Sequence, residues 1–267
     1  MFATIFLGDD MRIEKIKKLN SGKYKIVIEG DEDLITYDDV ILKNNLLTTN
    51  KLDKKLLLKI SVDTEYYSTY SKVINYIQTR LRSEKEIDVY LEKFQISNDE
   101  KIKIKNDLKK SGYINNINFA RAYIGDKMNL SNEGPNKIRN GLASHDIDDA
   151  TIELLISEIA ESDVYDKLYR LINKKIIGNH KHSKYQLREK IINNFMGLGY
   201  DVSLICQIFE DLYIEDSDIL NNEYNKIYNN LRKKYQDDEL YFKIRQKLYQ
   251  KGYKKDEINE IINKNIA

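Results

Sequence analysis

The 267-residue chain has little cysteine, proline or tryptophan and no long apolar run. Its single cysteine, Cys206, excludes an intramolecular disulfide framework and fits a reducing compartment. One proline leaves long stretches free to form helices. No apolar run reaches the roughly 18 residues of a membrane span, and the opening MFATIFLGDD lacks the positive flank of a signal peptide. We therefore expect a cytoplasmic protein without a membrane partner.

Net charge is also nearly absent, because 44 basic residues face 43 acidic ones. Any basic surface must therefore be local. Lys and Arg outnumber Asp and Glu between Lys167 and Lys190 and between Lys226 and Lys255. A helix face enriched in this way can meet phosphates or an acidic protein surface. The alternative is an ordinary solvated helix face.

Residues 1–63 are predicted to form a small β-rich extension. Apolar and polar residues alternate over 12–36 around the turn Asn20-Ser21-Gly22, which indicates a hairpin followed by a short third strand. Asp38 is expected to begin a helix. The segment Leu56–Val62 fits either a helix or a strand.

The segment from Arg80 to Ile124 has the pattern of three short helices, preceded by a helical apolar stripe over 66–81. Ser83 and Glu86 form a capping-box pattern, which places a helix start at residue 84. Gly112 follows two lysines, as expected for a left-handed C-cap. Tyr113 and the residue after it are expected to dock on the core.

A spacing of 53 residues relates the later turns Asp146-Ile147, Gly199-Tyr200 and Gly252-Tyr253. Each copy predicts a helix-turn-helix with a longer helix before it, and such units bury their apolar faces by stacking. The predicted fold is mainly α: tandem three-helix, helix-turn-helix-like repeats in an elongated curved array. Residues in phase across the copies are Lys137, Lys190 and Lys243, and Ile138, Ile191 and Ile244. The predicted repeat units cover residues 64–130, 131–160, 161–214 and 215–267. Tyr113, Tyr200 and Tyr253 are expected at equivalent core positions.

No constellation indicates catalysis. The acidic clusters, among them Asp9-Asp10 and Glu215 to Asp218, stand mostly at predicted helix starts or turns, where caps are expected. His180 and His182 form an HxH pair that could bind zinc, but no cysteine or third histidine lies nearby. Phosphate-loop and dinucleotide motifs are absent. We predict a protein that is not an enzyme and has no catalytic residue, metal or cofactor.

Arginine is the better candidate for contact, because its planar fork can hold phosphate or carboxylate bidentately. For Arg82 and Arg121, a salt bridge inside the first repeat, with Glu84 or Glu86, is the alternative. The candidate partner-binding or nucleic-acid-binding residues are Arg80, Arg82, Arg121, Lys137, Arg139, Arg188, Lys190, Lys243 and Arg245.

Three runs, RLRSEKEI, SGYINNINFARAYI and EGPNKIRNGLASHDID, carry a resemblance to the RecX family of bacterial regulators of the RecA recombinase. The resemblance is strongest from about Arg80 to Leu155. Two departures fall in turns: Asn115-Asn116 stands where an acidic residue is usual, and His145-Asp146 replaces a Lys-Gly-like pair. The matching positions are Arg80, Arg82, Ser83, Glu84, Gly112, Tyr113, Ile114, Phe119, Ala120, Arg121, Gly134, Pro135 and Ile138.

The resemblance implies a monomeric regulatory protein that binds the RecA–DNA filament. It would inhibit the recombinase, ATPase and co-protease activities of RecA, in DNA repair and the SOS response. A comparable β-rich N-terminal extension is found in RecX-like chains of Gram-positive bacteria. The alternative function is a nucleic-acid-binding helical module that contacts the backbone of single- or double-stranded DNA independently of RecA. A helical scaffold for unrelated partners is a third possibility.

Overall fold

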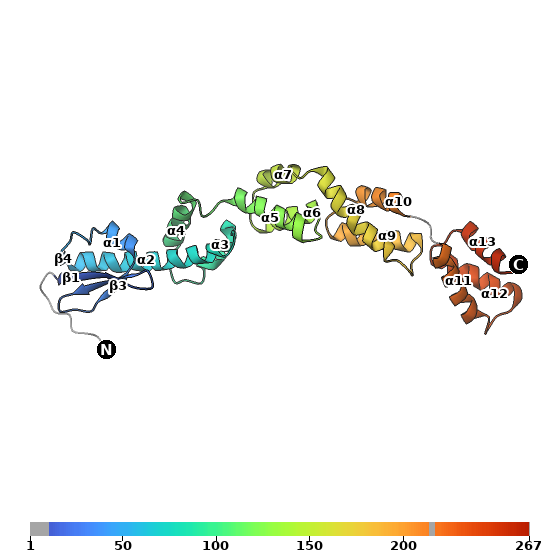
Figure 1. Ribbon diagram of the computed structural model, residues 1–267, viewed down its shortest axis with the longest axis horizontal. Coiled ribbons are helices and arrows are strands. Elements are labelled where there is room, and N and C mark those ends of the chain that lie inside the picture. The colour runs from blue at the N-terminus through green and yellow to red at the C-terminus, as the bar shows by residue number, and fades with distance from the viewer. Residues whose placement is uncertain (1–10, 214–216, 267) are drawn as a thin grey trace. The chain divides into compact units, whose positions relative to one another are not determined.

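The structure is a computed structural model that describes residues 11–213 and 217–266. The described residues form thirteen helices and four strands (Figure 1). They divide into two compact units, residues 1–119 and 120–267, with the boundary inside helix α5. The predicted fold class, a mainly helical repeat protein with a small β-rich N-terminal part, is confirmed.

The first unit begins with a four-stranded antiparallel sheet in the order β3-β2-β1-β4. Gly22 closes the predicted hairpin with a φ of 79°, a conformation that glycine adopts without steric cost. The predicted hairpin and third strand are confirmed, and Leu56–Val62 lies in a helix. The sheet packs on α1 and the start of α2 through buried Ile26, Leu52 and Ile60. The elements are β1 Met11–Lys18, β2 Tyr24–Ile28, β3 Leu34–Thr36, α1 Asp38–Lys43, β4 Lys51–Leu52 and α2 Lys54–Gln78.

The second part of α2 packs on α3 (Glu84–Leu91) and α4 (Asn98–Lys110) around a core that includes Val73, Ile87 and Leu108. Ser83 and Glu86 form the predicted capping box at the start of α3. Helix α5 (Asn116–Leu130) follows.

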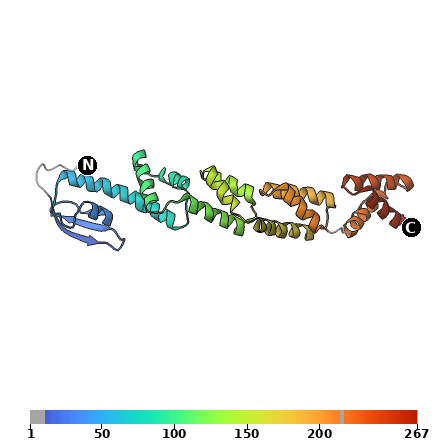
Figure 2. The same cartoon turned by 90° about the horizontal axis from the view of Figure 1, so that it is seen from above.

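The second unit continues with eight further helices that enclose two separate cores. One core lies among α8, α9 and α10 and the other among α11, α12 and α13. Figure 2 shows α8, α9 and α10 side by side, and each of these helices contacts the other two. The helices are α6 Pro135–Ser144, α7 Asp149–Ser157, α8 Glu161–Ile177, α9 Lys184–Gly197, α10 Val202–Leu212, α11 Ser217–Leu231, α12 Asp237–Gln250 and α13 Lys255–Ile266.

Four helices, α4, α6, α9 and α12, end in the same Schellman turn. The residue after each C-cap has positive φ: 74° at Gly112, 57° at Asp146, 88° at Gly199 and 86° at Gly252. The next N–H donates to the carbonyl five residues earlier, for example from Tyr200 to Phe195 at 3.1 Å. Ile147, Tyr200 and Tyr253 are buried after these turns. The 53-residue spacing therefore corresponds to a repeated local structure.

Tyr113 is the exception, and its predicted core position is wrong. Its side chain is 45% exposed, and Ile114 is buried in its place. The connection explains the difference. Asn115 caps α5 three residues after Gly112, by accepting the N–H of Asn118, whereas Asp201 caps α10 two residues after Gly199. The extra residue turns Tyr113 outward and Ile114 inward.

Candidate functional site

Two of the candidate binding residues, both arginines of the first unit, are held by one carboxylate. Arg80 and Arg82 both reach Glu86, Arg82 at 3.4 Å, and the Arg82 guanidinium lies 3.9 Å from the centre of the Tyr76 ring. Glu86 also accepts the Ser83 N–H. Burial raises the pKa of Glu86, but the hydrogen bonds from Arg80 and Ser83 bring it below its ordinary value. The two arginines therefore fix the start of α3, and Arg82 pairs with Glu86 as the sequence allowed.

Three more predicted residues pair with carboxylates in the second unit. Arg139 contacts Glu153 through two nitrogens, at 2.6 and 3.0 Å. Arg188 lies 3.5 Å from Glu210 and also contacts Cys206 Sγ at 3.2 Å. The third, Lys137, follows its partner by four residues, with Nζ 3.7 Å from a carboxylate oxygen of Glu133. Their charges are largely compensated.

Lys190, Lys243 and Arg245 differ from the other six candidates. In residues 11–213 and 217–266, no carboxylate lies within 4.0 Å of these three side chains. Lys190 Nζ lies 2.8 Å from Nε2 of His182. Lys243 lies 5.9 Å from the centre of the Tyr235 ring. Among the nine candidates, these three are the ones whose charge no nearby carboxylate of the described residues compensates.

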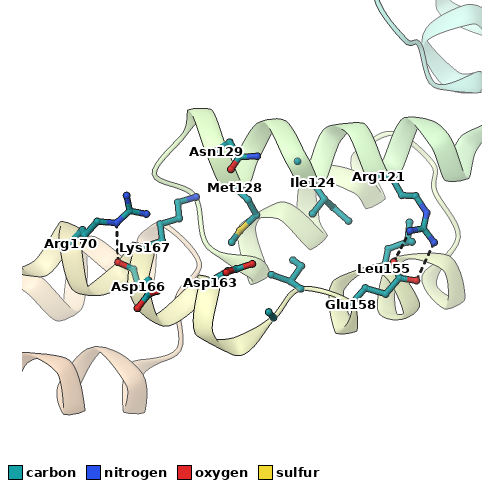
Figure 3. A pocket seen from close by; sticks show the side chains of 13 residues that line it. Arg121, Ile124, Met128, Asn129, Leu155, Glu158, Asp163, Asp166, Lys167 and Arg170 are labelled. Atoms are coloured by element: carbon teal, nitrogen blue, oxygen red, sulfur yellow. Dashed lines mark hydrogen bonds and ion pairs between the residues drawn. The ribbon is translucent and has the colours of Figure 1, made fainter.

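Arg121 lines a groove of about 580 Å³ between α5 and the connection from α7 to α8 (Figure 3). Its guanidinium pairs with Glu158, with N–O distances of 2.8 and 3.1 Å, and the side chain stays more than half exposed. Its partner is therefore neither Glu84 nor Glu86. Ile124, Met128 and Leu155 add apolar surface to the same groove. Three cationic and three anionic side chains line it, so its charges balance.

Lys167 is a buried member of this groove that the sequence grouped with the basic stretch. It is 7% exposed, and Nζ donates to the carbonyls of Lys127 and Glu133, both at 2.9 Å. Burial lowers the pKa of Lys167. Lys167 therefore joins α8 to the end of α5. The available signal was its place in an apolar helical stripe, next to Leu168 and five residues before Ile172.

Metal chemistry finds no support among the described residues, since no group of three or more His, Cys, Asp or Glu side chains is placed to hold an ion there. Asp9-Asp10 and Glu215-Asp216 lie outside the described residues. In the same part of the chain, no helix is long and apolar enough to cross a membrane.

The sequence and the fold were compared with those of known proteins. No protein-family model matches the chain. Proteins named regulatory protein RecX are similar over nearly the whole length. The one from Oceanobacillus iheyensis is 25% identical over 260 residues, 94% of this chain and 96% of the relative. The Lactococcus lactis protein is 28% identical over 268 residues, 96% of this chain and 97% of the relative.

Two solved structures share the fold. A crystal structure of regulatory protein RecX aligns with a TM-score of 0.64 at 19% identity, covering 75% of this chain and 99% of the other. That of RecX from Lactobacillus salivarius aligns with a TM-score of 0.52 at 26% identity, covering 55% and 96%. The fold and its surface define a helical-repeat protein with basic side chains on the helices that precede its repeated turns. Over nearly its whole length, the chain is similar to the RecX family of regulatory proteins.

Proposed function

We propose that this protein binds the RecA–DNA filament and inhibits its recombinase, ATPase and co-protease activities, as a cytoplasmic, monomeric regulator in DNA repair and the SOS response. The observation that carries the proposal is similarity to proteins named regulatory protein RecX over 91–96% of the chain. The protein acts by binding and needs no cofactor. Because a ligand shifts an equilibrium only by preferring one state, inhibition follows from tighter binding to the less active state of the filament.

The groove around Arg121 is the surface that we assign to the protein partner. Its apolar side chains, Ile124 and Met128, lie beside a charged rim, which is the usual anatomy of a protein interface. Arg121 is exposed and bound to an equally accessible carboxylate, Glu158, so it can exchange that partner at small cost. Balanced charge also favours a protein over a polyanion.

The test is ATP hydrolysis by the recombinase of the same organism on single-stranded DNA, with increasing amounts of the full-length chain. We expect hydrolysis to fall to a plateau, and M128D/R121A to require at least about tenfold more protein for the same inhibition. R139A is the matched control, because Arg139 is paired with Glu153 and does not line the groove. Unchanged hydrolysis at saturating wild-type protein would refute the proposal.

A second candidate function is binding to the DNA backbone without the recombinase. It is favoured by Lys190, Lys243 and Arg245, whose charges no nearby carboxylate compensates in the described residues. Binding of this kind weakens steeply with salt. Binding that appears only with the filament would argue against it.

A further inference from the structure

The corner between α8 and α9 holds a small basic pocket of about 240 Å³. Lys175 comes from the end of α8, Lys190 from the middle of α9 and His182 from the connection between them. Asn179 fixes this connection: its side-chain oxygen accepts the His182 N–H at 3.0 Å, and its amide donates to the His182 carbonyl at 2.8 Å. The basic groups are thus brought together by the fold.

The polar side chains of this pocket include no acid. Asn179 and Asn194 are its other polar side chains, and Leu187 and Ile191 form its apolar part. Glu189 stands next to Lys190 in sequence but lies near Arg188, at 3.8 Å. No carboxylate of the described residues lies within 4.0 Å of Lys175 or Lys190. An ammonium only donates hydrogen bonds, so Nε2 of His182 accepts from Lys190 in this arrangement.

In the second repeat, the lysine that corresponds to Lys190 is neutralised by a carboxylate. Lys137 is the counterpart of Lys190, 53 residues earlier, and Glu133 is the counterpart of Gln186. Glu133 contacts both Lys137, at 3.7 Å, and Lys127, at 2.9 Å. In the third repeat the residue 53 positions later is the neutral Gln186, in the first turn of α9, whereas Glu133 lies just before α6. Lys190 is therefore left without an anion four residues before it.

We infer that the α8–α9 pocket binds a phosphate-type oxyanion supplied by the backbone of a single-stranded nucleic acid. Lys175 and Lys190 donate to the phosphate oxygens, while His182 orients Lys190. The pocket volume is several times the roughly 30 Å³ that one water occupies in the liquid, so the pocket can hold a group larger than a single water. Lys174 and Lys181 lie beside the pocket in sequence and are exposed. Such flanking cations favour a chain of phosphates over a single carboxylate, because each further phosphate releases counterions. The inference deepens the second candidate function and does not depend on the recombinase.

The experiment measures binding of a fluorescent single-stranded oligonucleotide to the full chain, without recombinase, as a function of salt. K175Q/K190Q should weaken binding about tenfold and reduce the slope of log affinity against log salt by roughly 1.4. The matched control, K174Q/K181Q, removes the same amount of charge from α8 and the α8–α9 connection, at residues that do not line the pocket. It should weaken binding no more than about threefold. An equal or larger loss in the control would overturn the inference, as would no loss in K175Q/K190Q.

A second arm identifies the source of the oxyanion. The His182 ring resonance, assigned by its loss in H182Q, should shift and saturate with the oligonucleotide. Inorganic phosphate at the same ionic strength should shift it far less. A shift with inorganic phosphate or polyglutamate but not with the oligonucleotide would overturn the assignment to nucleic acid. Regulation of the recombinase is not measured here, so its failure and the failure of this pocket are separate results.

Discussion

In the second repeat Lys137 follows Glu133 by four residues, and in the third Lys190 follows Gln186 by the same distance. The backbones agree: α6 and α9 end in the same Schellman turn, and the isoleucines after the two lysines are both buried. The charges differ, because Glu133 neutralises its lysine and Gln186 cannot. The buried residues and the turns recur every 53 residues, whereas the charged residues on the surface differ from one repeat to the next.

The long helices show the same division. Lys167 in α8 is buried and hydrogen-bonded to two carbonyls, while the position 53 residues later is Leu220, packed against the core of α11 to α13. A lysine at an apolar position therefore joins neighbouring helices through polar bonds, where a leucine uses apolar contact. The same repeat position can serve either purpose.

The largest effect is expected where the turn after α9 packs on the earlier helix α6. In G199A the new Cβ would lie 2.3 Å from the Lys137 nitrogen, in a backbone with φ of 88°. Strain and overpacking together should lower the free energy of unfolding by about 3 kcal/mol. In G112A the φ is similar but nothing lies within 4 Å, so about 1 kcal/mol is expected. Equal losses in urea unfolding would show that the Gly199 turn does not pack as described.

The next effect concerns Lys167. In K167M the carbonyls of Lys127 and Glu133 lose their buried donor, which should cost about 2 kcal/mol of unfolding free energy. K174M, at an exposed position of the same helix, should change stability by less than about 0.5 kcal/mol. Urea unfolding of both variants distinguishes the loss of the Lys167 hydrogen bonds from a general loss of positive charge. Equal stability of the two variants would contradict a stabilising role for these hydrogen bonds.

A smaller effect should appear in the first unit, where Glu86 neutralises both arginines. Its folded-state pKa is lowered, so its stabilisation is present above the unfolded-state pKa and is lost as pH falls through the folded-state value. At pH 7, E86Q should cost about 1 kcal/mol. Below about pH 4 the difference from wild type should shrink. Unfolding curves at pH 7 and pH 3 measure this, with E92Q, at an exposed glutamate, as the control. A difference that does not depend on pH would rule out the ionised carboxylate as the cause.

Local chemistry made part of this structure predictable. The hairpin, the Ser83 capping box and the repeated turns follow from residues that lie close together in sequence. The side chain of Tyr113 could not be placed, because its direction depends on one extra residue before α5.

The sequence also could not predict which of the basic residues pair with carboxylates. Arg121 finds its carboxylate 37 residues away, and Arg139 finds one 14 residues away across a turn. The sequence therefore predicted nine candidate cations, but only tertiary structure separates the paired ones from Lys190, Lys243 and Arg245.

The smallest expected effect is also the most direct test of the comparison between the two corners. Q186E would place a carboxylate four residues before Lys190, as Glu133 lies four residues before Lys137, and glutamate is favourable in the first turn of a helix. We predict about threefold weaker binding of the single-stranded oligonucleotide, with stability not lowered and with Q186A binding as tightly as wild type. If folded Q186E binds as tightly as wild type, an uncompensated Lys190 is not what distinguishes the third repeat, and the account is contradicted.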